Sequence, residues 1–238
     1  SIAEQGKLTQ ALAAKILAAA SKQEVEDLYL PYKQKRRTKG QIAIEAGIEP
    51  LADKLFTDPA LQPQTEAEAF VLQEKTEAGD DFTTVLAVLD GVRDILSERW
   101  AQDAAMVQML REWLWQEADF CSKKTATANE NDAEVAKFRD YFDYREPIGR
   151  VPSHRALAVL RGRGLEFLSA SLQLPTDPSL TELEAGKAAN ALAEGRIARH
   201  LNWSHQARAA DDVLRKAVSW TWKVKLSLSL ERDLFQRL

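Results

Sequence analysis

The sequence predicts a mostly α-helical chain: a multi-helix array with a helix-turn-helix-like element, a short two-stranded β-hairpin and a long C-terminal helix. Apolar residues recur at three- and four-residue spacing along most of the 238 residues, as they do on one face of a helix. Alanine, leucine, lysine and glutamate, which favour helices, are abundant in these stretches. Capping residues precede helical stretches: Ser21 stands three residues before Glu24, the spacing of a capping box.

Residues 1–118 are expected to form a helical N-terminal region. Thr9 precedes an alanine- and leucine-rich helix. A second short helix follows Ser21 and ends before Pro31, because the residue before a proline is pushed out of the helical region. The other helical stretches of this region start at Thr38 and cover residues 65–76 and 82–118.

Residues 119–209 are expected to form a helix-turn-helix-like region with short strands. "DFCSKKTA", residues 119–126, and "LEFLSASLQL", residues 165–174, alternate apolar with small or polar residues, so we expect them to pair as strands. Between them, "VPSHRALAVLRGRG" predicts a short helix with Pro152 at its start and Gly162 after its end.

Residues 210–238 are expected to be the start of a long central helix. Their segment "KLSLSLE" alternates and would suit a strand equally well, but its flanks favour a helix. Residues 180–201 are helical by the same spacing. The chain starts at Ser1 without an initiator methionine and stops in an amphipathic pattern without a cap, so we expect a fragment of a longer protein.

The composition is that of a globular protein without a membrane span. Hydrophobic residues make up 45% and charged residues 29%, and no apolar run approaches the roughly 18 residues of a transmembrane helix. The start does not resemble a signal peptide, and the single cysteine, Cys121, cannot form an intramolecular disulfide. We therefore expect a cytoplasmic location.

Enzymatic signals are weak, and the sequence predicts a protein that is not an enzyme. Cys121 has lysines nearby but no evident base. His154, His200 and His205 lack zinc-ligand spacing, and no glycine-rich phosphate loop is present. Neighbouring acids at helix starts are typical of caps. We therefore expect no catalytic residues, no cofactor and no metal site.

Two stretches of the chain carry cations without intervening acids, although the formal net charge is -4. Surface charges are screened over about 8 Å at physiological salt, so acids elsewhere do not cancel them. We expect these stretches to bind the backbones of RNA or DNA. Their candidate residues are Lys33, Lys35, Arg36, Arg37 and Lys39 in the first stretch, and Arg150, His154, Arg155, Arg161 and Arg163 in the second.

The second stretch includes the helix predicted at residues 152–161. His154 and Arg161 are seven apart and share a face, with Arg155 beside them, while Leu157 and Leu160 are expected to point toward a core. The alternative is that the cations form a solvated face or pair with acids. The nearby acids are Asp140, Asp143 and Glu146.

Two pairs of tryptophans suggest a second function. Trp113 and Trp115, like Trp220 and Trp222, are two residues apart and cannot lie on one helical face. We expect one of each pair to pack inside and the other to be half exposed, at a joint between elements or at a surface that other parts of the protein cover. The alternative function is therefore a protein-interaction scaffold.

Three blocks resemble the bacterial Tex family of transcription accessory proteins. These blocks are "EDLYLPYKQKRRTKGQIAIEAGIEPLAD", "KFRDYFDYREPIGRVPSHRALAVLRGRG" and "AVSWTWKVKLSLSLERDLFQRL", in the family's order. The resemblance implies a multi-domain scaffold related to a eukaryotic transcription elongation factor, with a helical N-terminal half and a long central helix. It also implies later RNase H-like, helix-hairpin-helix and OB-fold RNA-binding domains outside these residues. The implied partners are nucleic acid, the remaining domains of the parent protein and transcription machinery, with no membrane.

Overall fold

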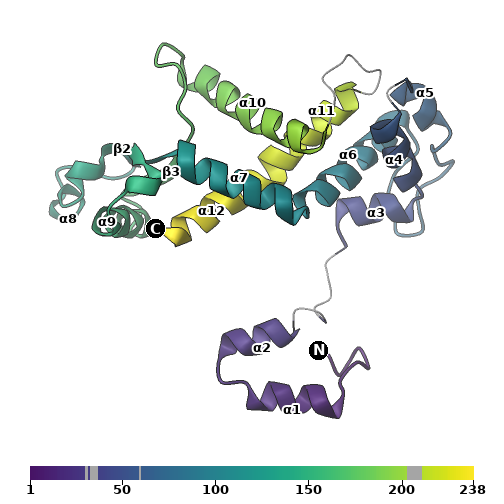
Figure 1. The fold of residues 1–238 in the computed structure, drawn as a ribbon, viewed down its shortest axis with the longest axis horizontal. Helices are drawn as coiled ribbons and strands as arrows, with labels where there is room; N and C mark the ends of the chain where they lie inside the picture. Colours follow the sequence, from purple (N-terminus) through teal and green to yellow (C-terminus); the bar gives the residue numbers. More distant parts are fainter. Residues whose placement is uncertain (30–31, 33–36, 59, 203–210) are drawn as a thin grey trace. The chain divides into compact units, whose positions relative to one another are not determined.

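A computed structural model describes residues 1–29, 32, 37–58, 60–202 and 211–238 (Figure 1). The chain divides into two compact units, Ser1–Thr38 and Lys39–Leu238, each of which is described by itself. Most of the described residues are helical, which confirms the predicted fold class. The functional boundaries expected near residues 118 and 209 stay predictions.

The first unit contains two short helices with the predicted caps. α1 spans Gln10–Ala18, and the Thr9 hydroxyl at its start accepts a hydrogen bond from the Leu12 N–H at 3.1 Å. α2 spans Lys22–Tyr29, and the Ser21 hydroxyl accepts from the Glu24 N–H at 3.2 Å. These side chains satisfy backbone donors that have no partner inside a first helical turn.

The second unit opens with five helices, and here two predicted boundaries were wrong. The stretch 82–118 is two helices, because Asp103 leaves the helical conformation and its carboxylate caps a new helix, accepting from the Met106 N–H at 3.1 Å. The stretch 65–76 ends early, because the Leu72 N–H bonds the Phe82 carbonyl at 3.0 Å across a turn. The helices are α3 (Lys39–Glu45), α4 (Glu49–Thr57), α5 (Pro63–Glu68), α6 (Val85–Ala101) and α7 (Ala104–Glu117).

A small antiparallel sheet follows α7. The predicted pairing is confirmed: β1 (Asp119–Lys124) pairs with β3 (Leu168–Gln173). The expected two-stranded hairpin is nevertheless a three-stranded sheet, because β2 (Asp143–Pro147) pairs with the other edge of β1. β2 lacks fully buried side chains and ends in proline, as is typical of an edge strand. Its sequence has no apolar alternation, so the strand was not predicted.

The helix between β2 and β3 is longer than predicted. α8 (Ala133–Ala136) and a 3-10 turn, η2 (Arg139–Tyr141), precede β2. A second 3-10 turn, η3 (Ile148–Arg150), follows β2 and leads to α9 (Ser153–Gly164).

Gly162 lies inside α9 rather than after it. This glycine is a packing residue, because a Cβ there would lie 2.6 Å from Leu168 Cδ1 and 3.0 Å from Phe138 Cδ1. The helix therefore lies close against β3.

The chain ends in α10 and a long helix, as predicted. α10 spans Glu182–His200 and starts with a capping box formed by Thr181 and Glu184. The long helix comprises α11 (Asp211–Trp220), a π-helical turn η4 (Thr221–Leu226) and α12 (Ser227–Arg237). The choice of helix for "KLSLSLE" is therefore confirmed.

The π-helical turn has a cause in the spacing of the buried residues. Val218, Trp222, Leu226, Leu230 and Leu234 are buried at successive intervals of four. At 3.6 residues per turn, each such interval rotates the face by about 40°, so a regular helix would turn these side chains away from the core. The wider π turn absorbs part of this rotation.

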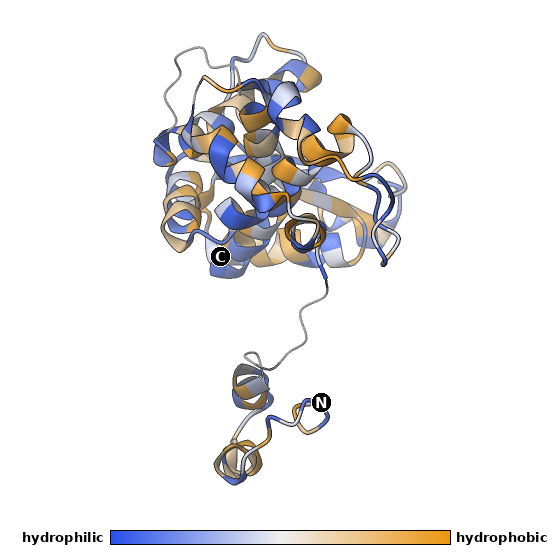
Figure 2. Ribbon diagram, turned by 90° about the vertical axis from the view of Figure 1, so that its right-hand side faces the viewer, coloured by the Kyte–Doolittle hydropathy of each residue, from blue (hydrophilic) through white to orange (hydrophobic). Residues whose placement is uncertain are grey.

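The core of the second unit is a continuous cluster of buried side chains that runs from α3 and α4 through α6, α7, α10 and the C-terminal helix to the sheet. Phe120 of β1 packs edge-on against Phe235 of α12, with ring centroids 5.1 Å apart. Figure 2 shows hydrophobic and hydrophilic segments side by side along these helices, as amphipathic packing requires. Within the described ranges, no helix is both long enough and apolar enough to cross a membrane.

Candidate nucleic-acid interface

The first predicted cationic stretch lies mostly where the structure gives no description. Lys33, Lys35 and Arg36 are outside the described residues. Arg37 is exposed, and Lys39 is exposed at the first residue of α3. The geometry of a site can therefore be built only for the second stretch.

α9 presents a mixed cationic and apolar stripe to solvent. Successive residues of an α-helix are rotated by about 100°, which places His154, Leu157 and Arg161 on one face. All three are exposed, whereas the opposite face buries Ala156 and Val159. The shared face of His154 and Arg161 is as the sequence predicts.

The expectation for Leu157 was wrong. Its side chain is 67% exposed, while Leu160 is half-buried against the core. The small residues Ala156 and Gly162 allow α9 to approach the sheet on another face, and this orientation turns Leu157 outward. Helical spacing alone could not choose between these two faces.

Arg155 points away from that stripe and contacts β2. Its Nη1 lies 3.5 Å from a carboxylate oxygen of Glu146, one of the acids anticipated as a partner. A hydrogen bond to the Tyr144 hydroxyl, together with the Glu146 charge, raises the pKa of Arg155. Tyr144 donates its own hydroxyl hydrogen to Glu146, and burial followed by that contact raises the pKa of Tyr144 to about 12. Arg155 is therefore engaged within the protein.

Arg163 is also engaged. Its guanidinium lies 5.4 Å from the centroid of the Phe235 ring, a cation–π contact that links α9 to α12. Arg150, at the end of η3, and Arg161 are exposed, and neither forms an ion pair within the part of the chain that the structure describes. Arg155 and Arg163 are exposed as well, but within the described part of the chain Arg150 and Arg161 are the arginines of this stretch without an ion pair or ring contact, and His154 lies beside Arg161 on the exposed face of α9.

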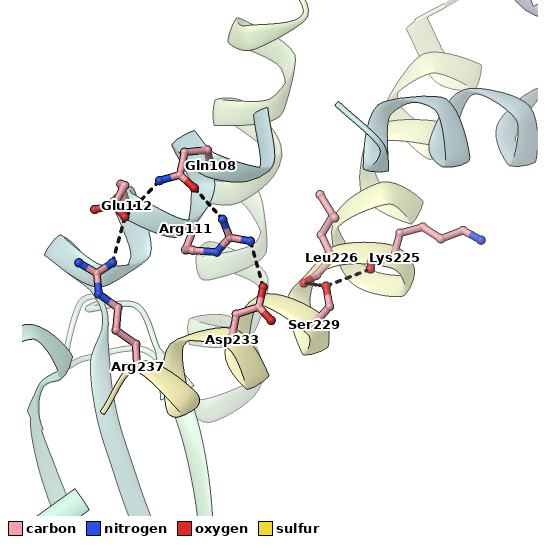
Figure 3. Close-up of polar contacts among 8 residues, drawn as sticks. All are labelled: Gln108, Arg111, Glu112, Lys225, Leu226, Ser229, Asp233 and Arg237. Atoms are coloured by element: carbon pink, nitrogen blue, oxygen red, sulfur yellow. Dashed lines mark hydrogen bonds and ion pairs between the residues drawn. The ribbon is translucent and has the colours of Figure 1, made fainter. Parts of the chain in front are cut away.

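A polar seam of ion pairs joins α7 to α12 (Figure 3). Arg111 pairs with Asp233 at 3.0 Å, and Arg237 pairs with Glu112 at 2.9 Å. Arg237 also lies 4.2 Å from the centroid of the Trp115 ring. The sequence did not indicate this seam, because its partners are more than 100 positions apart and no local pattern connects them.

The same tryptophan holds η3 in place. A Cβ at Gly149 would lie 3.2 Å from the Trp115 carbonyl oxygen and 3.4 Å from its Nε1, so glycine permits this close approach. Arg150 follows directly. The packing of η3 against Trp115 of α7 therefore fixes the backbone position of the exposed Arg150.

The prediction for the tryptophan pairs is confirmed. Trp113 and Trp222 are buried, while Trp115 and Trp220 are half-buried. The half-buried rings are covered in part by arginines: besides Arg237 on Trp115, Arg93 lies 3.9 Å from the Trp220 centroid. Such contacts cover ring faces that would otherwise be available to a partner.

The single cysteine is poorly suited to nucleophilic chemistry. Cys121 is buried in the central strand, and burial raises the pKa of its thiol to about 11, so the thiolate is scarce at neutral pH. Among the residues that the structure describes, no group of three or more histidine, cysteine, aspartate or glutamate side chains could hold a metal ion.

Comparisons with known proteins identify the family. A family model described as Tex central region-like matches residues 58–238. The chain is 47% identical over 234 residues to protein YhgF of Escherichia coli (strain K12), which covers 98% of this chain and 28% of that protein. It is 41% identical over 240 residues to protein tex of Bordetella pertussis, covering all of this chain and 29% of that protein.

A more distant relative is human. S1 RNA-binding domain-containing protein 1 of Homo sapiens is 26% identical over 178 residues, 73% of this chain and 17% of that protein. The chain therefore belongs to the Tex family of transcription accessory proteins, as the resemblance of its three blocks indicated. It spans under a third of the length of these relatives.

Proposed function

We propose that this region is a non-enzymatic helical scaffold module of a cytoplasmic Tex-type protein, and that it contributes contacts to RNA or DNA backbones during transcription regulation. The observation that supports it most directly is the solvent-facing group of Arg150, His154 and Arg161 on η3 and α9. These side chains are held on elements that pack against the sheet and α7. A rigid support places charges without a large entropic cost on binding.

Backbone binding fits this geometry better than base recognition. The two exposed arginines can neutralise phosphates and the histidine can hydrogen-bond to one, which supplies affinity without reading sequence. The first cationic stretch is proposed to make backbone contacts of its own, through Lys33, Lys35, Arg36, Arg37 and Lys39. Arg155 and Arg163 act mainly in positioning α9. The printed names of relatives, a transcriptional accessory protein and an S1 RNA-binding domain-containing protein, agree with this role.

The test is a charge reversal on η3 and α9. The double variant Arg150→Glu/Arg161→Glu is compared with Lys187→Glu/Lys216→Glu, which makes the same change in net charge at exposed positions of α10 and α11. Binding to a labelled single-stranded and a duplex oligonucleotide is measured by anisotropy from low to moderate salt. Loss of two phosphate contacts should make the slope of log affinity against log salt concentration, measured with the duplex, shallower by about 1.8.

The expected result is at least about a tenfold weaker affinity at low salt for the first variant and less than about twofold for the control. Thermal unfolding of both variants checks that the fold is intact. Equal losses in both variants would show that only net charge matters. Absence of binding by the unmodified chain at low salt would remove the nucleic-acid role.

A further inference from the structure

A groove of about 890 Å³ lies in the second unit, away from the solvent-facing stripe of α9. Its walls come from the loop between β3 and α10, the first turns of α10, and the C-terminal helix around η4 and α12. Figure 1 shows that this loop rises away from the sheet before α10 begins. No step of the proposed nucleic-acid role uses this groove.

The groove has an apolar lining. Leu114, Leu172, Leu174 and Leu180 line it together with Trp222. The indole N–H of Trp222 donates to the Asn190 side-chain oxygen at 3.0 Å, so the polar atom is satisfied and the ring is held in place. At the rim, Leu228 is 71% exposed. The surface therefore offers apolar contact without an unsatisfied indole donor.

Small residues on α10 keep the groove open. Ala185, Gly186 and Ala189 line it, and a Cβ built at Gly186 meets no atom within 4 Å. Residues this small leave space for leucine-sized side chains from outside. A larger side chain at position 186 would occupy that space without a steric conflict with the protein itself.

The charges of the groove favour a cationic occupant. Asp119 and Arg145 pair with each other at 2.7 Å and largely cancel. Among the described residues of the lining, Lys123 is then the one remaining cation, against three acids: Asp177, Glu182 and Glu231. Hydrogen bonds from the Ser179 N–H and hydroxyl lower the pKa of Asp177.

We propose that this groove binds a basic amphipathic helix of a protein partner, with leucine-type side chains against the apolar lining and lysine or arginine against the acidic rim. Helix-in-groove recognition uses apolar anchors at i, i+3, i+4 and i+7, which the leucine and tryptophan side chains of this groove can accept. Phosphates would be repelled by the acidic excess, so nucleic acid is a poor occupant. The inference is independent of the α9 site.

The experiment uses the whole 238-residue chain and a short fluorescein-labelled peptide of leucine and lysine, with leucines at i, i+3, i+4 and i+7. A second peptide keeps the leucines and replaces every lysine with glutamate. The lysine peptide should bind saturably, and the glutamate peptide at least about tenfold more weakly, because only the first complements the rim.

Paired variants locate the site. Gly186→Leu fills the groove and should lower the affinity for the lysine peptide at least about tenfold, because the leucine side chains of the peptide can no longer be buried there. Gly195→Leu is the matched control: it lies on the same helix, also meets no atom within 4 Å, and does not line the groove. Leu228→Asn should also weaken binding, whereas Leu192→Asn, exposed on α10 outside the groove, should not.

Equal affinity of the Gly186→Leu variant and its Gly195→Leu control would overturn the proposal, as would equal binding of the two peptides. Weaker oligonucleotide binding by Gly186→Leu than by Gly195→Leu, measured without the peptide, would assign the groove to nucleic acid instead. Self-association that is lost only in Gly186→Leu, measured by sedimentation, would assign the groove to a second copy of the chain. The α9 charge reversals leave this assay unchanged, so failure of either proposal is recognised separately.

Discussion

The solvent-facing stripe of α9 and the groove beside α10 differ in how their residues are assembled. The stripe comes from one continuous helix, so its cations are neighbours in the sequence. The groove combines residues from Leu114 to Glu231, contributed by α7, the sheet, α10 and the C-terminal helix. The comparison teaches that local pattern can reveal a site carried by one element, but not a site that several elements share.

The two regions also differ in which charges remain available. In the stripe region, Glu146 and Phe235 engage Arg155 and Arg163, although the sequence places no acid among these cations. In the groove, Arg145 is engaged by Asp119, and this leaves an acidic excess. Availability of a charged side chain thus depends on its tertiary neighbours more than on its sequence neighbours.

The largest expected effect is on stability, and it tests the packing of α9 against β3 without changing the charges on the exposed face of α9. Gly162→Leu should destabilise the second unit by about 1–3 kcal/mol, because the new side chain would overlap buried Leu168 and Phe138. Gly164→Ala, where a Cβ meets no atom within 4 Å, is the control and should change stability by less than about 0.5 kcal/mol. Urea unfolding measures both. Equal stability of the two variants would mean that α9 does not need close packing on β3.

An intermediate effect is expected on the groove side. Asn190→Ala removes the acceptor of the part-buried Trp222 indole N–H and should cost about 1 kcal/mol of unfolding free energy. The lysine peptide should also bind more weakly, because the ring is no longer held, while oligonucleotide binding stays unchanged. Loss of oligonucleotide binding at unchanged stability would instead show that the two regions are coupled.

The smallest effect concerns the charge network behind α9. Glu146→Gln should lower the pKa of Tyr144 from about 12 only in part, because burial is the larger cause of the raised value and the Glu146 contact the second. Ultraviolet absorbance of tyrosinate during an alkaline titration measures this change. A return to the ordinary tyrosine value would show that Glu146, rather than burial, dominates.

Much of the architecture could be predicted from local pattern. Helical spacing identified the α-rich array, capping residues located starts such as those after Thr9 and Ser21, and alternation identified β1 and β3. The edge strand β2 escaped prediction because its side chains lie half or fully exposed and carry no apolar period. The break at Asp103 was missed because its capping role becomes evident only when the helix restarts.

The sequence by itself determined the helical class, the family and the stretch of cations on α9, since each depends on residues that lie close together in the chain. Tertiary structure alone decided that Leu157 faces outward, that arginines cover Trp115 and Trp220, and that a groove opens beside Gly186. These outcomes depend on which faces of distant elements pack together. Packing is settled by the shape and volume of side chains across the whole core, which no local spacing records.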